Sequence, residues 1–178
     1  MTSRNRSGNT VNADVSPDWQ SGSRLTRLPQ QTNNIRIRDA KPSDAPELAM
    51  LMCELGYETR PVEMEARLKL ILSNPSYKTF VAVMDGCICG MIGTLTYPSY
   101  EHNDPSGRIL ALVTSSTARR RGIGRALIAT AEKDFGQRGI RRIALDTRLT
   151  REVAHKFYES LGYEQNGWRF VRQLPVSN

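Results

Sequence analysis

Apolar residues recur along the chain at two intervals, at every second position in some stretches and at every third or fourth position in others. Alternation is typical of strands with one buried face, and the longer interval is typical of helices that pack one stripe on a core. The alternating stretches predict strands at residues 35–38, 79–84, 87–96, 108–113, 143–146 and 168–174. The helical stretches lie at residues 44–55, 61–73, 123–135 and 153–161.

Turn residues separate these elements. Asp85-Gly86 and Asn166-Gly167 are dipeptides typical of tight hairpins, so each is expected to join two antiparallel strands. The resulting order is β-α-α-β-β-β-α-β-α-β-β. It predicts an α+β (mixed α/β) domain with a mostly antiparallel twisted sheet of about six to seven strands, flanked by about four helices.

Residues 1–34 are rich in Ser, Asn, Thr, Arg and Gln and contain few apolar positions. Such a composition buries too little apolar surface to offset the entropy lost on ordering, so we expect a disordered or loosely docked N-terminal extension. The folded domain is expected at residues 35–178, a length that suits one domain with its own core.

One stretch, Arg119 to Ala126, has the properties of an anion-binding turn. It follows a strand-like run and precedes a helix, and Gly122 and Gly124 let its backbone curl tightly. The amides at the start of the next helix lack internal partners and lie at the positive end of its dipole. A phosphate or pyrophosphate suits such a place, and the arginines around it add positive charge.

Charge and cysteine content narrow the classes of partner and location. The formal net charge is +7, and basic residues cluster around the turn, which favours a local polyanion over an evenly charged coat. Three cysteines make no disulfide framework, which favours a reducing, cytoplasmic location. Cys87 and Cys89 lack other ligands at metal-site spacing, so we expect no metal. No apolar run approaches the ~18 residues of a membrane span, and the N-terminus lacks the apolar core of a signal peptide.

Two common phosphate-binding motifs fail on their residues. A dinucleotide-binding fingerprint needs a third glycine where Leu127 stands, and an early unit with parallel strands. A P-loop needs Gly-Lys-Ser/Thr, whereas Gly124 is followed by Arg125 and Ala126. The anion site therefore belongs to another class.

The run LVTSSTARRRGIG at residues 112–124 resembles the acetyl-CoA motif of the GNAT superfamily of N-acetyltransferases, R/Q-x-x-G-x-G/A, with Arg119, Gly122 and Gly124 in its fixed places. The run AHKFYESLGY at residues 154–163 resembles the family's second motif, A-x-x-F-Y-x-x-x-G-F/Y. Both have the family's order and separation, and the predicted element order matches from about residue 35 to residue 174. The resemblance implies a GNAT-like fold.

The resemblance also implies how acetyl-CoA binds. The backbone amides of the turn would hold the pyrophosphate, and the end of the central strand would pair with the pantetheine arm as an added strand would. In the family that strand often carries a bulge and splays from the next strand, which opens the slot. Arg151 stands where many relatives carry Asn and is expected to help bind the cofactor. The implied cofactor-binding residues are Leu112, Val113, Thr114, Arg119, Arg120, Arg121, Gly122, Ile123, Gly124, Arg125 and Arg151.

Tyr158 matches the family tyrosine near the thioester sulfur, so the resemblance implies that it acts as general acid toward the departing thiolate. A phenol with an ordinary pKa of ~10 stays protonated at neutral pH and can donate. The motifs do not give the base, because Arg108 stands where some relatives place a glutamate. We take Glu101 as the working candidate for the base. The alternatives, acting directly or through water, are His102, Asp104 and Asp146.

Together these residues imply an N-acetyltransferase that moves an acetyl group from acetyl-CoA to a primary amine by direct transfer in a ternary complex. No cysteine falls in either motif, which argues against a covalent acetyl-enzyme. The acceptor is expected to be a small-molecule amine, or a lysine or N-terminal amine of a peptide. The resemblance allows a homodimer, on which the sequence is silent.

Three alternatives stay open at this point. One is a non-catalytic CoA-binding sensor or regulatory module, and another is an acyltransferase that uses a different acyl-CoA. The third is nucleic-acid binding by the arginine cluster, which would be steeply salt-dependent and which we do not expect. The acceptor pocket is expected among the first two helices, the 97–107 loop and the final hairpin. The acidic side chains there do not identify the acceptor, since exposed acids are usually solvated.

Overall fold

Five strands form a single sheet in the order β1-β2-β3-β4-β5 within residues 34–175, the part of the chain that the computed structural model describes. They are β1 (Arg36–Asp39), β2 (Tyr77–Met84), β3 (Cys87–Tyr97), β4 (Ser106–Thr114) and β5 (Ile143–Leu145). Neighbouring strands are antiparallel except β4 and β5, which are parallel. The predicted α+β class and mostly antiparallel sheet are confirmed, with fewer strands than expected. Residues 1–33, where the N-terminal extension is expected, and residues 176–178 lie outside the described part.

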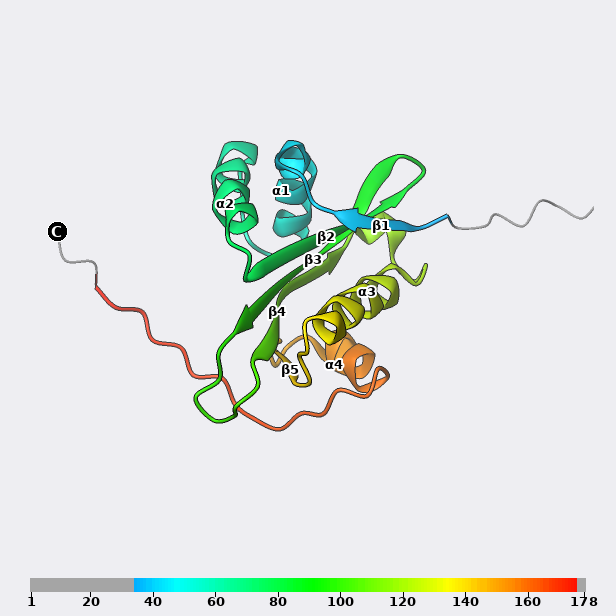
Figure 1. Ribbon diagram of the computed structural model, residues 1–178. Helices are drawn as coiled ribbons and strands as arrows, with labels where there is room; N and C mark the ends of the chain where they lie inside the picture. Colours follow the sequence, from blue (N-terminus) through cyan, green and yellow to red (C-terminus); the bar gives the residue numbers. More distant parts are fainter. Residues whose placement is uncertain (1–33, 176–178) are drawn as a thin grey trace, which may run out of the picture. The chain divides into compact units, whose positions relative to one another are not determined.

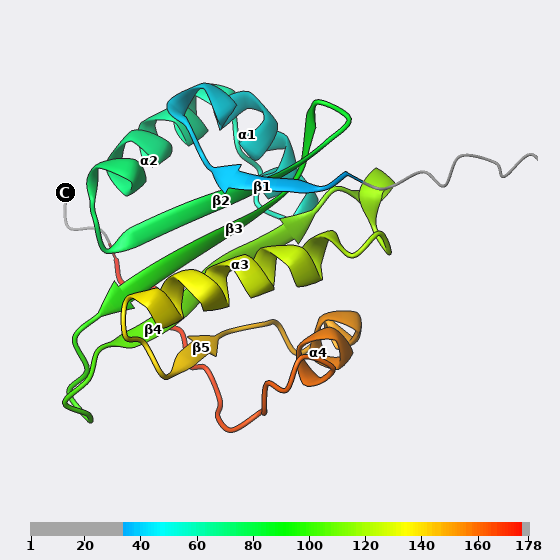
Figure 2. The same ribbon diagram turned by 45° about the vertical axis from the view of Figure 1, so that its right-hand side comes forward.

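Helices cover both faces of the sheet. The described helices are α1 (Ala45–Glu54), α2 (Pro61–Ser73), α3 (Ile123–Gln137) and α4 (Glu152–Glu159), with short 3-10 turns η1 (Pro42–Asp44) and η2 (Ser116–Ala118). The α1–α2 pair lies on one face and α3 lies along the other (Figure 1). Figure 2 shows α4 beside α3 and near β5, on the side of the sheet away from β1. The four predicted helices are confirmed.

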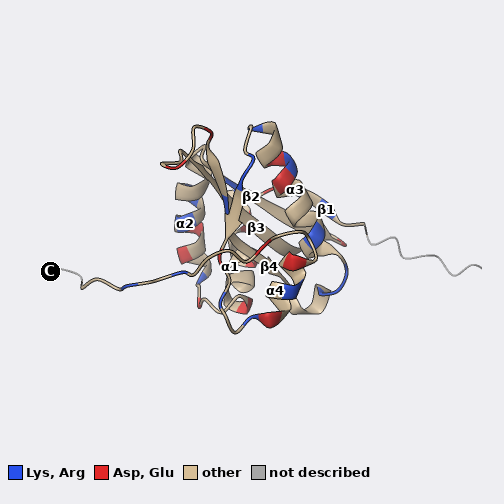
Figure 3. Ribbon diagram, turned by 90° about the horizontal axis from the view of Figure 1, so that it is seen from below, with Lys and Arg blue, Asp and Glu red and all other residues tan. Residues whose placement is uncertain are grey.

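Two buried clusters hold these layers together. One joins α3 to the sheet and contains Leu127 and Phe135, and the other joins α1 and α2 to the sheet and contains Leu48 and Leu68. Gly90 of β3 lets α3 lie directly on the sheet, since a Cβ there would be 2.9 Å from Cγ2 of Ile123. Charged residues gather on the helices and loops, whereas β3 carries none (Figure 3).

An ion pair fixes the start of α1 to β1. Arg38 of β1 donates from Nη1 and Nη2 to the two carboxylate oxygens of Asp44, at 2.7 and 2.9 Å. The amide of Lys41 donates to the same carboxylate at 2.7 Å. These hydrogen bonds, chiefly those from the Arg38 side chain, hold the pKa of Asp44 below its usual value despite burial. Asp44 therefore ties the chain between β1 and α1 into one rigid corner.

Strand β4 changes its pairing halfway along. Gly93 of β3 faces Ala111 and Thr94 faces Ile109, so Leu110 is the extra residue of a β-bulge. On the other edge, β5 pairs only with the first part of β4, from Gly107 to Ile109. From Leu110 to Thr114 that edge of β4 has no strand partner within the described residues. The bulge and the splayed edge are those that the resemblance implied.

The predicted hairpin at Asn166-Gly167 and the strand at residues 168–174 are wrong. Residues 164–175 contain neither helix nor strand, and Trp168 and Phe170 are 74% and 92% exposed. Their alternation with polar residues matches a half-buried strand, but no apolar surface of the described domain covers them. β5, the neighbour such a hairpin would need, is only three residues long.

Candidate active site

The turn before α3 has the geometry of an anion site. Gly122 lies at φ +81° and Arg120 at φ +62°, so the backbone passes twice through the left-handed region before α3 begins at Ile123. No side chain among the described residues caps α3, and its first helical bond joins the amide of Ala126 to the carbonyl of Gly122 at 3.0 Å. The amides before that bond therefore point outward at the positive end of the helix dipole and suit a phosphate.

Gly124 brings the two sequence motifs into contact. A Cβ at this position would lie 3.2 Å from Cζ of Phe157, so the first turn of α3 packs closely on α4 only because the residue is glycine. The side chains of Arg119, Arg120 and Arg125 are exposed around the turn. The turn, the start of α3 and the face of α4 that carries Phe157 thus form one connected site.

Tyr158 follows Phe157 on α4 and is half-buried among aromatic rings. Its ring lies 5.3 Å from that of Phe157 and 5.8 Å from that of Tyr163, both edge to face. Burial raises the pKa of the Tyr158 phenol, and the nearby positive charge of Arg151 partly opposes that rise. Its hydroxyl forms no hydrogen bond to any residue between 34 and 175, so its proton is available to a bound molecule.

Arg151 links α4 to the end of α1. Its Nη2 donates to the carbonyl of Leu55 at 2.6 Å, between residues 96 positions apart in the chain. Beside it, the guanidinium of Arg148 lies over the ring of Tyr57, 5.5 Å from the ring centre. The structure therefore places Arg151 at the junction of α1, α4 and Tyr158, with part of its guanidinium engaged by the protein itself.

The base candidates lie in different surroundings. Asp146 is ion-paired with Arg108 and, at 3.5 Å, with Arg169. Asp104 is ion-paired with Arg142 at 3.3 Å. Glu101 is exposed in the loop before β4, and its carboxylate has no ion-pair or hydrogen-bond partner within residues 34–175.

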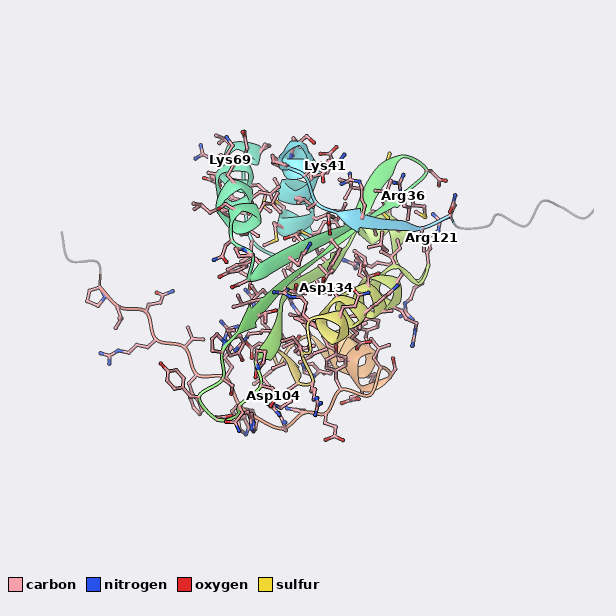
Figure 4. The ribbon with its side chains drawn as sticks, in the orientation of Figure 1. Arg36, Lys41, Lys69, Asp104, Arg121 and Asp134 are labelled. Carbon is pink, nitrogen blue, oxygen red and sulfur yellow. The ribbon has the colours of Figure 1, made fainter. Side chains whose placement is uncertain are left out.

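The loop that contains Glu101 lies far from the glycine turn. Figure 4 shows Asp104 of that loop and Arg121 of the turn at opposite ends of the domain. This agrees with the chain order, because the loop precedes β4 and the turn follows it. His102 shares this loop and is exposed. A base from this loop would act at the end of the slot remote from the phosphates.

One contact that shapes the site could not be predicted from the sequence. Glu54, at the end of α1, accepts a hydrogen bond from the amide of Ser116 at 2.6 Å and from the hydroxyl of Ser115 at 3.2 Å. Ser116 begins the short 3-10 turn η2 that leads into the arginine-rich turn, so Glu54 helps to fix where that turn begins. Because the partners are 61 and 62 positions apart, no local pattern marks the contact.

Within residues 34–175, no group of three or more His, Cys, Asp or Glu side chains is placed to hold a metal ion. No helix in this part of the chain is long and apolar enough to cross a membrane. The candidate site is thus described by its backbone amides, its arginines and Tyr158.

Comparison with known proteins matches residues 45–163 to the family model described as acetyltransferase (GNAT) family. The chain is 30% identical over 139 residues to the aminoalkylphosphonate N-acetyltransferase of Salmonella typhimurium, covering 78% of this chain and 90% of that protein. Both motifs of the candidate site fall inside the matched region.

Solved structures share the fold. A GNAT family acetyltransferase of Staphylococcus aureus is 29% identical, with a TM-score of 0.68 over 79% of this chain and 98% of that one. An aminoglycoside N-acetyltransferase in complex with CoA is 20% identical, with a TM-score of 0.74 over 84% of this chain and all of that one (100%). At 20% identity, the second match shows a shared fold and nothing about activity.

Proposed function

The chain belongs to the GNAT family of acetyltransferases, and we propose that it transfers an acetyl group from acetyl-CoA to the primary amine of a small molecule, directly and within a ternary complex. The aminoalkylphosphonate N-acetyltransferase of Salmonella typhimurium, which acts on a small amine by its name, supports this acceptor class. The structure supports the donor side through its turn and strand geometry.

The observation that carries the proposal is the open edge of β4. From Leu110 to Thr114 this edge has no strand partner in the described part of the chain, and it leads straight to the anion-binding turn before α3. An extended arm with amide groups can bind there as an added strand, while its phosphates lie on the turn. Acetyl-CoA has this combination of a pyrophosphate and an amide-bearing arm.

The chemistry follows from the groups around that slot. The lone pair of a neutral amine attacks the thioester carbonyl carbon, and the C–S bond breaks as the new C–N bond forms. Tyr158 gives its proton to the departing thiolate, and solvent reprotonates the phenolate. The proton lost by the amine passes to a base, for which Glu101, acting through water, is the working candidate.

The positions of the three cysteines favour direct transfer over a mechanism with a covalent acetyl-cysteine intermediate. Cys89 is buried, and burial raises the pKa of its thiol, which disfavours the nucleophilic thiolate. Cys53 lies on α1 and donates to the carbonyl of Thr59, and Cys87 opens β3 beside the β2–β3 turn. None of the three lies in the turn or on α4.

The test is release of free CoA from acetyl-CoA over a panel of small amines, polyamines, aminoglycosides and lysine peptides. We expect release that depends on a small amine and yields one acetylated amine for each CoA. Binding of acetyl-CoA without release for any amine would favour a CoA sensor and overturn the proposal. Turnover with succinyl-CoA in preference to acetyl-CoA would overturn the choice of donor.

A further inference from the structure

A pocket of 130 Å³ lies between the α1–α2 pair and the sheet. Gly93 of β3 and the bulge residues Leu110 and Ala111 of β4 line it on the sheet side. Three methionines, whose side chains adapt readily to different shapes, also line it: Met52, Met64 and Met91. An apolar cavity of roughly 150 Å³ can hold a benzene molecule, so this pocket has room for a small apolar group.

The pocket meets the reactive end of the proposed cofactor slot. Leu110 and Ala111 line the pocket and are also the first residues of the open β4 edge. With phosphates on the turn after Thr114, the arm runs back along β4 for about 13 Å, at ~3.3 Å per residue, before it reaches Leu110. The acyl group therefore arrives at the bulge, where the pocket begins. This step rests on the proposed function.

The charges around the pocket are not those that attract a polycation. No carboxylate is among the described residues that line it. Arg67 is at its rim, where its Nη1 donates to Thr59 Oγ1 at 3.2 Å. Glu63 is shared between Arg60, at 2.7 Å, and Arg67, at 3.9 Å. One carboxylate between two guanidinium groups leaves a net positive charge at the rim.

Three acidic residues of α1, α2 and the loop before β4 are also engaged by the protein itself. Glu54 binds the serines before the turn, Glu65 is ion-paired with Lys69 at 2.8 Å, and Asp104 is ion-paired with Arg142. None of them faces the pocket as a spare negative charge. The surroundings therefore suit an anionic rather than a polycationic acceptor.

We propose that this pocket binds the non-reacting part of the acceptor, and that the acceptor is a small primary amine with a compact apolar body and one anionic group. The apolar body lies among the methionines, and the anionic group, a carboxylate or a phosphonate, lies against Arg67. The amine then points toward the β4 bulge and the thioester.

Gly93 offers a clean test of the pocket. A Cβ at Gly93 would have no atom within 4 Å. Successive residues of a strand face opposite sides of the sheet, so Gly93 faces the α1–α2 side, as Met91 does, and Ile92 faces α3. Gly93→Val therefore fills the pocket, and β-branched residues suit strands. We expect the KM of the preferred amine to rise roughly tenfold or more, while the Kd of acetyl-CoA and the thermal midpoint stay unchanged.

Two further variants keep this test decisive. Gly93→Ala adds a single methyl group and is expected to give a smaller rise in KM, in proportion to the space it takes. Gly136→Ala, on α3 and also with no atom within 4 Å of its Cβ, is the matched control and should leave KM unchanged. An unchanged amine KM in folded Gly93→Val and Gly93→Ala would overturn the pocket assignment.

The anionic group is tested by matched acceptors. We expect the kcat/KM of wild type to be higher, roughly tenfold or more, for an acceptor with an anionic group, either an aminoalkylphosphonate or an apolar amino acid. The reference acceptors are the neutral amide of the same skeleton and spermidine. Arg67→Gln should remove that preference, and Lys69→Gln, on the same helix but outside the pocket, should keep it. A preference for spermidine, or one unaffected by Arg67→Gln, would overturn the acceptor class. No CoA release with any amine in wild type would instead overturn the proposed function itself.

Discussion

The proton-donor role proposed for Tyr158 depends on its neighbours. Burial raises the pKa of the phenol, so the protonated form persists to higher pH than for an exposed tyrosine. Arg151 opposes that rise, because its charge favours the phenolate that forms when the proton is given away. The sequence motif makes Tyr158 a candidate, but it could not show that Arg151 lies close enough to act on it.

Replacement of this tyrosine by phenylalanine tests its role. We expect Tyr158→Phe to lower kcat roughly 100-fold or more while the Kd of acetyl-CoA changes little, because the variant removes a proton donor and keeps the ring. Tyr163→Phe is the matched control, since the Tyr163 hydroxyl donates to Glu132 at 3.0 Å instead of facing the slot. Unchanged turnover in Tyr158→Phe, measured by CoA release, would remove Tyr158 from the chemistry.

Asp44 makes the stability of the domain depend on acid pH. The pKa of Asp44 is lowered in the folded state. The contribution of its carboxylate to stability is therefore complete above the unfolded-state pKa of ~3.9, and it is lost as the pH falls through the folded-state pKa. Asp44→Asn should lower the free energy of unfolding by roughly 1–3 kcal/mol at pH 7, and by less as the pH drops below ~4.

Urea denaturation at several pH values measures this difference. Asp39→Asn is the control, because Asp39 forms a looser and more exposed ion pair with Lys78 at 3.7 Å and should change stability by less than ~0.5 kcal/mol. A gap between wild type and Asp44→Asn that stays constant down to pH 2 would contradict the ion-pair account.

Among the elements, those defined by local signals follow the sequence closely. Asp85 and Gly86 lie at φ 52° and 80°, as a tight hairpin between β2 and β3 requires, and α3 begins at Ile123 directly after the glycine turn. The expected strand at residues 168–174 does not form, because no partner strand pairs with it in the described part of the chain. Alternation of apolar and polar residues cannot show whether such a partner is within reach. The contact of Glu54 with Ser116 likewise depends on distant parts of the chain.

The contact between α3 and α4 should control cofactor binding. Gly124→Val would force side-chain atoms into Phe157 and move the first turn of α3, so we expect the Kd of acetyl-CoA to rise roughly tenfold or more. Gly136→Ala, later in the same helix with open space around it, should leave the Kd unchanged. Calorimetric titration measures both, and an unaltered Kd in Gly124→Val would show that the turn tolerates a shift.

For the molecule as a whole, two features of one strand set the architecture of the site. The bulge at Leu110 and the early end of β5 pairing leave half of β4 open on the side toward α4. The sequence predicted the fold class, the four helices and the turn from periodicity and glycines. The sequence predicts an acceptor pocket among the first two helices, the 97–107 loop and the final hairpin. The pocket proposed for the acceptor is instead lined by α1, α2 and strands β2 to β4, which meet only in the folded chain.

We propose that acetyl-CoA binds along this open edge of β4 with its phosphates on the turn before α3. Hydrogen–deuterium exchange with and without acetyl-CoA tests it directly. We expect slower exchange on binding in peptides covering residues 110–125, and unchanged exchange in the exposed loop at residues 98–104. Acetyl-CoA that binds without protecting residues 110–125 would contradict it.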